Sequence, residues 1–223
     1  MKRFIILVAA IVCGSLTLSL AASSADKESP NNYGENMWGL ERDESGLRHQ
    51  VEVNAGFITG GKLRLKDDKG LIKTNFSRPY IDAVVGARFT DYVFAGVGVG
   101  VQYAYGDCRL IQLATQNAPE KWGAVMMPIY FNVKGYVPTK TIVYPYISVG
   151  IGGNVVLSSN FSREGYGHLR GGMFCKFGAG LTVSKFNFGL GMVSQSLKWI
   201  NADNVTNFKA GNNAFYIEAG VKF

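Results

Sequence analysis

The last eleven residues, 213–223, alternate between apolar and other side chains, and this pattern strongly restricts what the chain can fold into. The apolar set takes every second position and ends on the terminal aromatic: Phe215, Ile217, Ala219, Val221 and Phe223. Because successive side chains of a strand point to opposite faces, the pattern predicts a strand with one apolar face. Its length matches the about 9–11 residues that a tilted strand needs to cross the hydrocarbon of a bilayer.

The same alternation recurs in seven earlier segments, the first of which begins at Arg48. The others lie at about 80–90, 93–102, 125–137, 143–152, 175–183 and 186–192. We expect long connections after the first, third, fifth and seventh strands and short turns after the others. An even strand number with short turns at one end and longer loops at the other is typical of outer-membrane barrels. The prediction is therefore an all-β fold, an up-and-down transmembrane β-barrel of about eight antiparallel strands over 48–223.

The first 25 residues have the pattern of a signal peptide. Lys2 and Arg3 precede an apolar core, and the small residues 21–25 follow it. Residues 26–47 are polar, and we expect a periplasmic tail with a short helix around Met37. The leader carries two of the formal +7 charges, so the mature chain is near +5. This charge is not concentrated as a nucleic-acid binder requires, so no nucleic-acid partner is expected.

An alternating terminal strand that closes on Phe223 resembles the C-terminal signature of bacterial outer-membrane barrels. With the eight segments, the chain is similar to the small OmpA-type and opacity-protein-type barrels, a porin-like β-barrel domain. The resemblance covers about 48–223 and implies a Gram-negative outer membrane reached after signal-peptide export. It also implies that the terminal strand is recognised by the barrel-assembly machinery. The assembly signature is then Phe223, Val221, Ala219, Ile217 and Phe215.

Parity separates two faces of the barrel but does not by itself say which one is outside. The apolar set consists mostly of Val, Ile, Leu, Phe and Ala, which suits contact with lipid. The other set is rich in glycine and tyrosine and poor in charge, which suits a narrow, filled lumen. We expect the apolar set outside. The alternative is a secreted soluble barrel whose apolar set lines a cavity.

Charged side chains of the second set are then expected to project into the lumen. Burial makes an isolated charge costly, so these groups should pair. Glu52 and Glu218 lie on the strands that must meet at closure. Two neighbouring carboxylates would need cations, and the candidates are Lys176, Arg88 and Lys134. A structural plug is favoured over a charged gate. The predicted lumen charge network is Arg48, Glu52, Asp82, Arg88, Lys134, Lys176 and Glu218, and Lys222 has the same parity.

A lipid-modifying barrel enzyme, acting on lipid A or phospholipid, and a narrow small-solute pore are the alternatives. An acyl-transfer or deacylase site needs a histidine near a serine with an orienting carboxylate. The mature chain has only His49 and His168; His168 lies near Ser162 and Glu164, but no His-x-Ser spacing follows it. We therefore expect no catalysis, and a scaffold with a mostly plugged lumen. No metal-ligand spacing appears, and no cofactor is expected.

The first loop is rich in basic residues and is a candidate for binding anionic lipid. Lipopolysaccharide headgroups would be natural partners for this charge, although an ordinary solvated hairpin would have the same composition. The candidate contacts are Lys62, Arg64, Lys66 and Lys69, with Lys73 and Arg78 counted in the same basic loop. Expected partners are thus outer-membrane lipid and lipopolysaccharide, and the protein is expected to be a monomer. Cys108 and Cys175 are expected to stay unpaired.

Overall fold

The computed structural model describes residues 48–67, 70–90, 92–107, 121–137, 139, 142–160, 168–200 and 207–223. Within these ranges it does not describe the side chains at 60–67, 70–76, 107, 122, 199 and 207–210. The predicted signal peptide, the tail at 26–47 and Cys108 lie outside the described residues. No helix among the described residues is both long and apolar enough to span a membrane.

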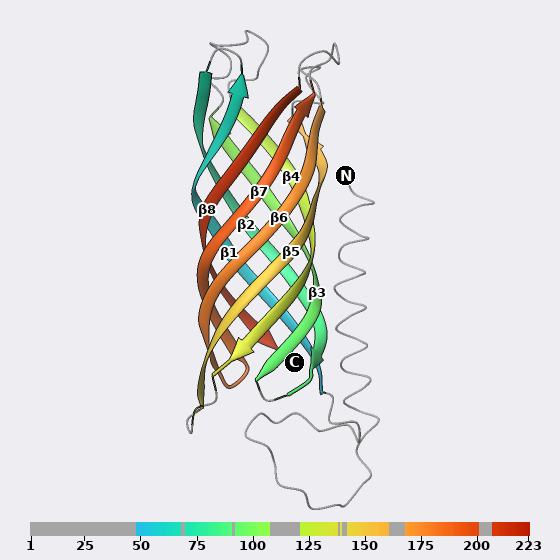
Figure 1. The fold of residues 1–223 in the computed structure, drawn as a ribbon, viewed down its shortest axis with the longest axis vertical. Helices are drawn as coiled ribbons and strands as arrows, with labels where there is room; N and C mark the ends of the chain where they lie inside the picture. Colours follow the sequence, from blue (N-terminus) through green and yellow to red (C-terminus); the bar gives the residue numbers. More distant parts are fainter. Residues whose placement is uncertain are drawn as a thin grey trace, which may run out of the picture.

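Eight strands form one closed antiparallel barrel in which each strand pairs with its neighbours in the chain and β1 pairs with β8 (Figure 1). This confirms the predicted fold class. The strands are β1 Arg48–Asp67, β2 Gly70–Arg88, β3 Val93–Asp107, β4 Lys121–Tyr136, β5 Val143–Ser159, β6 His168–Val183, β7 Phe186–Ile200 and β8 Asn207–Lys222.

The barrel closes at the two ends of the described chain. The backbone N–H of Phe223 donates to the carbonyl of Val51 at 2.8 Å, and the N–H of Val51 donates back at 3.0 Å. Glu52 pairs in register with Lys222, and Phe57 with Ile217. The terminal alternating strand therefore completes the ladder and leaves no open sheet edge.

The predicted long connection after the first strand is wrong. β2 begins at Gly70, ten residues before the predicted start, and pairs with β1 up to Asp67. Charged residues such as Lys73 and Arg78 interrupt the apolar alternation in this segment, so the sequence pattern did not predict a strand there. The backbone nevertheless stays paired with β1. β5 and β7 likewise run further than predicted, to Ser159 and Ile200.

The predicted short turns join the strands at the end where the barrel closes. Between β2 and β3, the hydroxyl oxygen of Thr90 accepts hydrogen bonds from the N–H groups of Tyr92 and Val93, at 3.2 and 3.1 Å. Between β6 and β7 the turn has only two residues, and Ser184 takes a φ of 53°. A tight antiparallel turn needs such a left-handed residue to reverse the chain.

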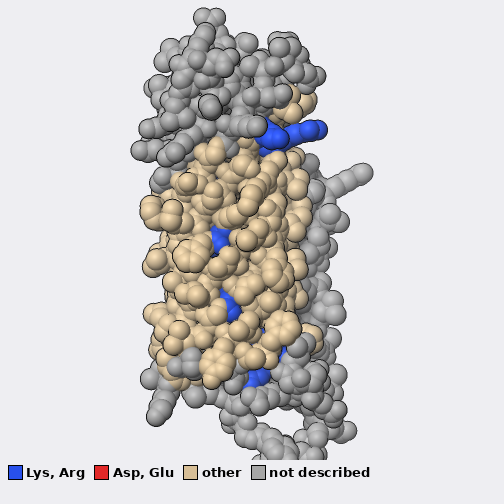
Figure 2. Space-filling view, viewed as in Figure 1, with Lys and Arg blue, Asp and Glu red and all other residues tan. Residues whose placement is uncertain are grey.

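The apolar face is outside, as predicted. Ile217 is 63 % exposed and Leu190 66 %, whereas Tyr216 is 3 % exposed on the opposite face. Figure 2 shows an outer surface almost free of charge on the side drawn, with no acidic residue visible and a few small basic patches. The inward face holds the buried polar and charged side chains, so the core of this molecule is its lumen.

Candidate functional site

An ion-pair cluster crosses the middle of the lumen and joins three strands. The ammonium of Lys176, on β6, lies 2.5 Å from Glu218 Oε2 on β8 and 3.5 Å from Asp82 Oδ2 on β2. All three side chains are at least nine-tenths buried. β6 and β8 flank β7, so the contact with Glu218 passes over the inner face of β7. β2 lies four strands from β6, so the contact with Asp82 crosses the interior.

Two tyrosines complete this central cluster. The hydroxyl of Tyr80 donates to Glu218 Oε2, and the hydroxyl of Tyr130 donates to Asp82 Oδ2, each at 2.8 Å. The amide of Asn54 donates to the other oxygen of Asp82 at 2.9 Å. Each carboxylate therefore has both a cation and neutral donors, which is the condition for a buried ion pair to be tolerated.

A second ion pair lies nearer the end where the chain closes. Lys134 on β4 contacts the carboxylate of Glu52 on β1, and the amide of Gln50 donates to the same carboxylate at 2.6 Å. The ammonium of Lys134 also stands 4.7 Å from the centre of the Tyr146 ring. Glu52 and Glu218 were expected side by side, but each binds its own lysine. In register they are four residues apart along β1, because Glu218 lies opposite Gly56 and not Glu52.

Arg78 forms a third polar layer towards the loop end. Its predicted place in the basic first loop is wrong, because it lies in β2, is 0 % exposed and points inward. Its guanidinium contacts the side chain of Gln195 and donates to Asn212 at 2.8 Å. Arg78 has the same parity in β2 as Tyr80 and Asp82, which point inward. This parity would have predicted its position if β2 had been expected to begin before Arg78.

Tyrosine rings fill the space that glycines leave on the inward face. The ring of Tyr130 lies over Gly98, where an added Cβ would come within 2.5 Å of it. The hydroxyl of Tyr216 similarly lies over Gly178, where the separation would be 1.9 Å. At these positions the glycine makes room for a ring from another strand, so the glycine- and tyrosine-rich face noted in the sequence is packed.

The remaining predicted network residues lie at the closing end of the barrel. Arg48 and Arg88 are direct partners in the β1–β2 register, and both are buried. The Arg88 guanidinium stacks 4.3 Å from the centre of the Tyr136 ring. All seven residues of the predicted lumen network are thus buried on the inward face, but in separate clusters.

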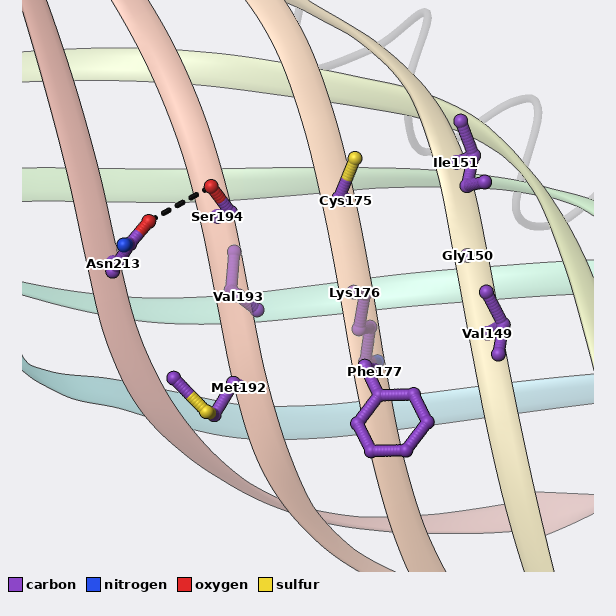
Figure 3. A pocket seen from close by; sticks show the side chains of 10 residues that line it. All are labelled: Val149, Gly150, Ile151, Cys175, Lys176, Phe177, Met192, Val193, Ser194 and Asn213. Atoms are coloured by element: carbon purple, nitrogen blue, oxygen red, sulfur yellow. Dashed lines mark hydrogen bonds between the residues drawn. The ribbon is translucent and has the colours of Figure 1, made fainter.

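A shallow hollow of about 290 Å³ opens on the outer, lipid-type face over β5 to β8. Figure 3 shows Ile151, Cys175 and Ser194 on this face, with the side chain of Lys176 on the far side of the sheet. The hydroxyl of Ser194 donates to Asn213 at 2.8 Å. Cys175 is free. None of the ten residues that line the hollow is a histidine, an aspartate or a glutamate.

The two histidines of the chain are exposed and far apart in the fold. His49 begins β1 opposite Ala87, and His168 begins β6 opposite Ile200 at the other end of the barrel. Ser162 and Glu164, considered with His168, lie outside the described residues. Among the residues the structure does describe, no group of three or more His, Cys, Asp or Glu side chains could hold a metal ion.

The candidate lipopolysaccharide contacts lie outside what the structure describes, which includes neither Lys69 nor the side chains of Lys62, Arg64 and Lys66. The assembly signature is described: Phe215, Ile217 and Phe223 are exposed on the outer face of β8 and at its end.

Comparison with solved structures agrees with this architecture. The chain is similar to the outer-membrane protein AlkL, seen by solid-state NMR in DMPC bilayers, with a TM-score of 0.52, 14% identity, and coverage of 87% of this chain and 97% of AlkL. The fold is that of a small outer-membrane barrel. OprG from Pseudomonas aeruginosa matches at TM-score 0.46 and 11% identity, covering 78% of this chain and 95% of OprG.

The outer-membrane enzyme PagL matches at TM-score 0.41 and 13% identity, covering 75% of this chain and 97% of PagL. No family model and no curated protein matches the chain. At these identities the comparisons establish the fold and not the activity. The narrower resemblance to OmpA-type and opacity-type barrels stays a prediction.

Proposed function

We propose that the protein is an integral barrel of a Gram-negative outer membrane that serves as a non-conducting scaffold for its loops and does not catalyse a reaction. The membrane location is supported by the outward apolar belt. A face on which Phe215 and Ile217 are each 63 % exposed would be a large apolar patch in water, whereas in lipid it is the expected surface.

The observation that carries the scaffold proposal is the contact of Lys176 with both Asp82 and Glu218. Their strands β6, β2 and β8 lie around the barrel, so the cluster spans the lumen at mid-height. The Tyr80 and Tyr130 hydroxyls tie the rings to the same carboxylates. A filled, paired interior of this kind supports a plug and argues against a water-filled channel.

Planar-bilayer recording of the purified, folded protein tests this proposal. The wild type is expected to show no steady conductance. The triple variant Asp82→Ser, Lys176→Ser and Glu218→Ser, checked for folding by heat-modifiable migration, is expected to conduct. A steady current through the wild type would favour the narrow small-solute pore.

The enzyme alternative has a separate test. Lipid A and phospholipid from a deletion strain and from the complemented strain are expected to have the same acyl composition. A consistent gain or loss of one acyl chain that depends on the protein would contradict the scaffold proposal and identify a lipid-modifying enzyme.

The partners we propose are outer-membrane lipid, lipopolysaccharide at the basic first hairpin, and the barrel-assembly machinery at β8. The support is the basic composition of 62–69 and the outward aromatic and aliphatic side chains of the terminal strand. Neutralising Lys62, Arg64, Lys66 and Lys69 to Gln should weaken lipopolysaccharide binding and make it less sensitive to salt. Equal binding by this variant and the wild type would remove the hairpin from the proposal.

A further inference from the structure

The outer wall over β7 changes in polarity from the middle of the apolar belt to the loop end. Every second side chain of this part of the strand is exposed on the outer face, and the outward set is Leu190, Met192, Ser194, Ser196 and Lys198. Two apolar side chains are thus followed by two hydroxyls and then by an ammonium group. A membrane lipid presents its acyl chain, its ester or hydroxyl groups and its charged headgroup in the same order.

Two cations face each other at the loop end of this wall. Lys198 is the register partner of Arg170 on β6, and both side chains are exposed. Like charges directly opposite each other destabilise a pair of strands, so this position favours a bound anion. The wall over β3 and β4 differs, because its exposed Lys121 lies opposite an acidic residue, Asp107. Figure 2 shows basic surface at the loop end of the side drawn, above an almost uncharged belt.

The height of these two cations matches the headgroup layer of a membrane. Leu190 is the register partner of Ile217 in the apolar belt, and Lys198 is eight positions nearer the loop end. At about 3.3 Å per residue and a tilt of about 35–45°, eight positions correspond to roughly 20 Å along the barrel axis. The apolar band of such a barrel is about 25 Å tall, so its edge lies roughly 12 Å from its middle. Arg170 and Lys198 therefore stand just beyond the hydrocarbon.

The hollow of about 290 Å³ lies below the cations on the same wall. Its edge towards the loop end is polar, because the Ser194 hydroxyl and the Asn213 amide meet there at 2.8 Å. Figure 3 shows Met192 and Phe177 on the other side of the hollow, and both are about half exposed, at 48 % and 58 %. The hollow therefore has an apolar floor towards the midplane and hydrogen-bonding groups towards the headgroups.

We infer that this wall binds one molecule of lipopolysaccharide through its phosphorylated lipid. An acyl chain fills the hollow, its ester or hydroxyl group lies beside Ser194 and Asn213, and a phosphate lies between Arg170 and Lys198. A guanidinium suits this role because it can donate two parallel hydrogen bonds to a phosphate. The inference rests on the outer-membrane location proposed above, and the site is separate from the basic first hairpin.

The two cations also argue against a second copy of the chain as the occupant. Homodimers usually form around a two-fold axis, which brings the same surface of both copies together. Such a contact over β6 and β7 would place two sets of Arg170 and Lys198 near each other, and like charges brought together oppose association. An anionic lipid removes this repulsion.

Titration with bisphosphorylated lipid A tests the charged part of the site. The purified mature protein in detergent is followed by native mass spectrometry, and folding is checked by heat-modifiable migration. Arg170→Gln with Lys198→Gln should weaken binding by about fivefold for each cation lost, or about thirtyfold in all. The control, Lys121→Gln with Lys185→Gln, removes two exposed lysines from other parts of the barrel and should bind as the wild type does. Lipid A without phosphate should bind the wild type and the Arg170/Lys198 variant equally. Equal affinities of the two variants for bisphosphorylated lipid A, or dimers that form without lipid, would overturn the inference.

A second pair of variants tests the hollow. Met192→Trp fills it and should weaken lipid A binding, whereas Ile129→Trp on β4, at a position of similar exposure outside the hollow, should not. Equal binding by the two variants would overturn the inference.

The first hairpin is separated by repeating the titration in the variant with Gln at 62, 64, 66 and 69. The effect of Arg170→Gln with Lys198→Gln should keep its size in this background. If only the hairpin changes affect binding, the wall site is wrong and the hairpin proposal stands. Recovery of the protein in the outer-membrane fraction tests the proposed location by itself.

Discussion

Lys176 and Glu218 are 2.5 Å apart inside the barrel, although they are 42 residues apart in the chain and lie on the two strands that flank β7. The same ammonium lies 3.5 Å from Asp82 on β2, which is four strands away from β6 in the closed barrel. The contact with Asp82 therefore joins opposite walls of the barrel. The central cluster therefore has one cation shared between two carboxylates.

Replacing Lys176 with Met should destabilise the barrel strongly. It leaves Asp82 and Glu218 buried without their cation, and breaking a buried pair costs about 3–5 kcal/mol. Urea unfolding of the protein in lipid vesicles, followed by tryptophan fluorescence, gives the free energy. Lys185→Met, which removes an exposed turn lysine, should be near neutral. If both variants unfold at the same urea concentration, the central cluster does not stabilise the fold.

Gly98 should not tolerate alanine. Its added Cβ would lie within 2.5–2.8 Å of three atoms of the Tyr130 ring, whose hydroxyl is held by Asp82 and cannot move away freely. Overpacking of this kind typically costs about 1–3 kcal/mol. Gly211→Ala is the control, since nothing lies within 4 Å of the position of its Cβ. The same urea titration compares them, and a Gly98→Ala protein as stable as Gly211→Ala would contradict the packing described.

Side-chain parity separated the two faces of the barrel, and the composition of each set predicted which face is outside. Ile217 and Tyr216 are adjacent in the chain, and their exposures of 63 % and 3 % agree with this assignment. The eight alternating segments, of which the terminal strand is one, predicted the strand number. The face of a side chain and the number of strands both follow from alternation along the chain, which can be seen in a single sequence.

Lys134 and Lys176 were among the cations predicted to pair with Glu52 and Glu218, but which one meets which carboxylate could not be predicted. Side-chain parity gives the face of a residue and not its height along the barrel axis. Which residues meet inside the lumen depends on how the strands of the closed barrel are staggered. In this barrel the stagger brings Lys134 to Glu52 and Lys176 to Glu218. Arg78 was missed for a related reason. Its strand continues into a charged hairpin, where backbone pairing with β1 holds the chain extended without an apolar pattern.

Cys108 and Cys175 should remain unlinked. Cys175 lies on the outer face of β6, opposite Ile151 on β5 and Ser194 on β7, and is free. Cys108 lies outside the described residues, one position beyond the end of β3. β3 and β6 are not neighbours in the barrel, and a disulfide needs Cα atoms within about 7 Å. Non-reducing peptide mass spectrometry that found the two cysteines joined would require a different strand order.

Arginine on the outer face of β8 should cost less the nearer it lies to the loop end. Ile217 is surrounded by the apolar belt, so Ile217→Arg should cost about 2–4 kcal/mol, the range for a lipid-facing arginine near the midplane of a membrane barrel. Asn213 lies on the same face, four residues towards the loops, beside the Ser194 hydroxyl. Asn213→Arg should therefore cost about 0–1 kcal/mol, because the guanidinium can reach the interface. Vesicle unfolding of both variants gives the difference directly. Equal costs would place both positions at one depth, and an Ile217→Arg protein as stable as the parent would mean that this face does not meet lipid.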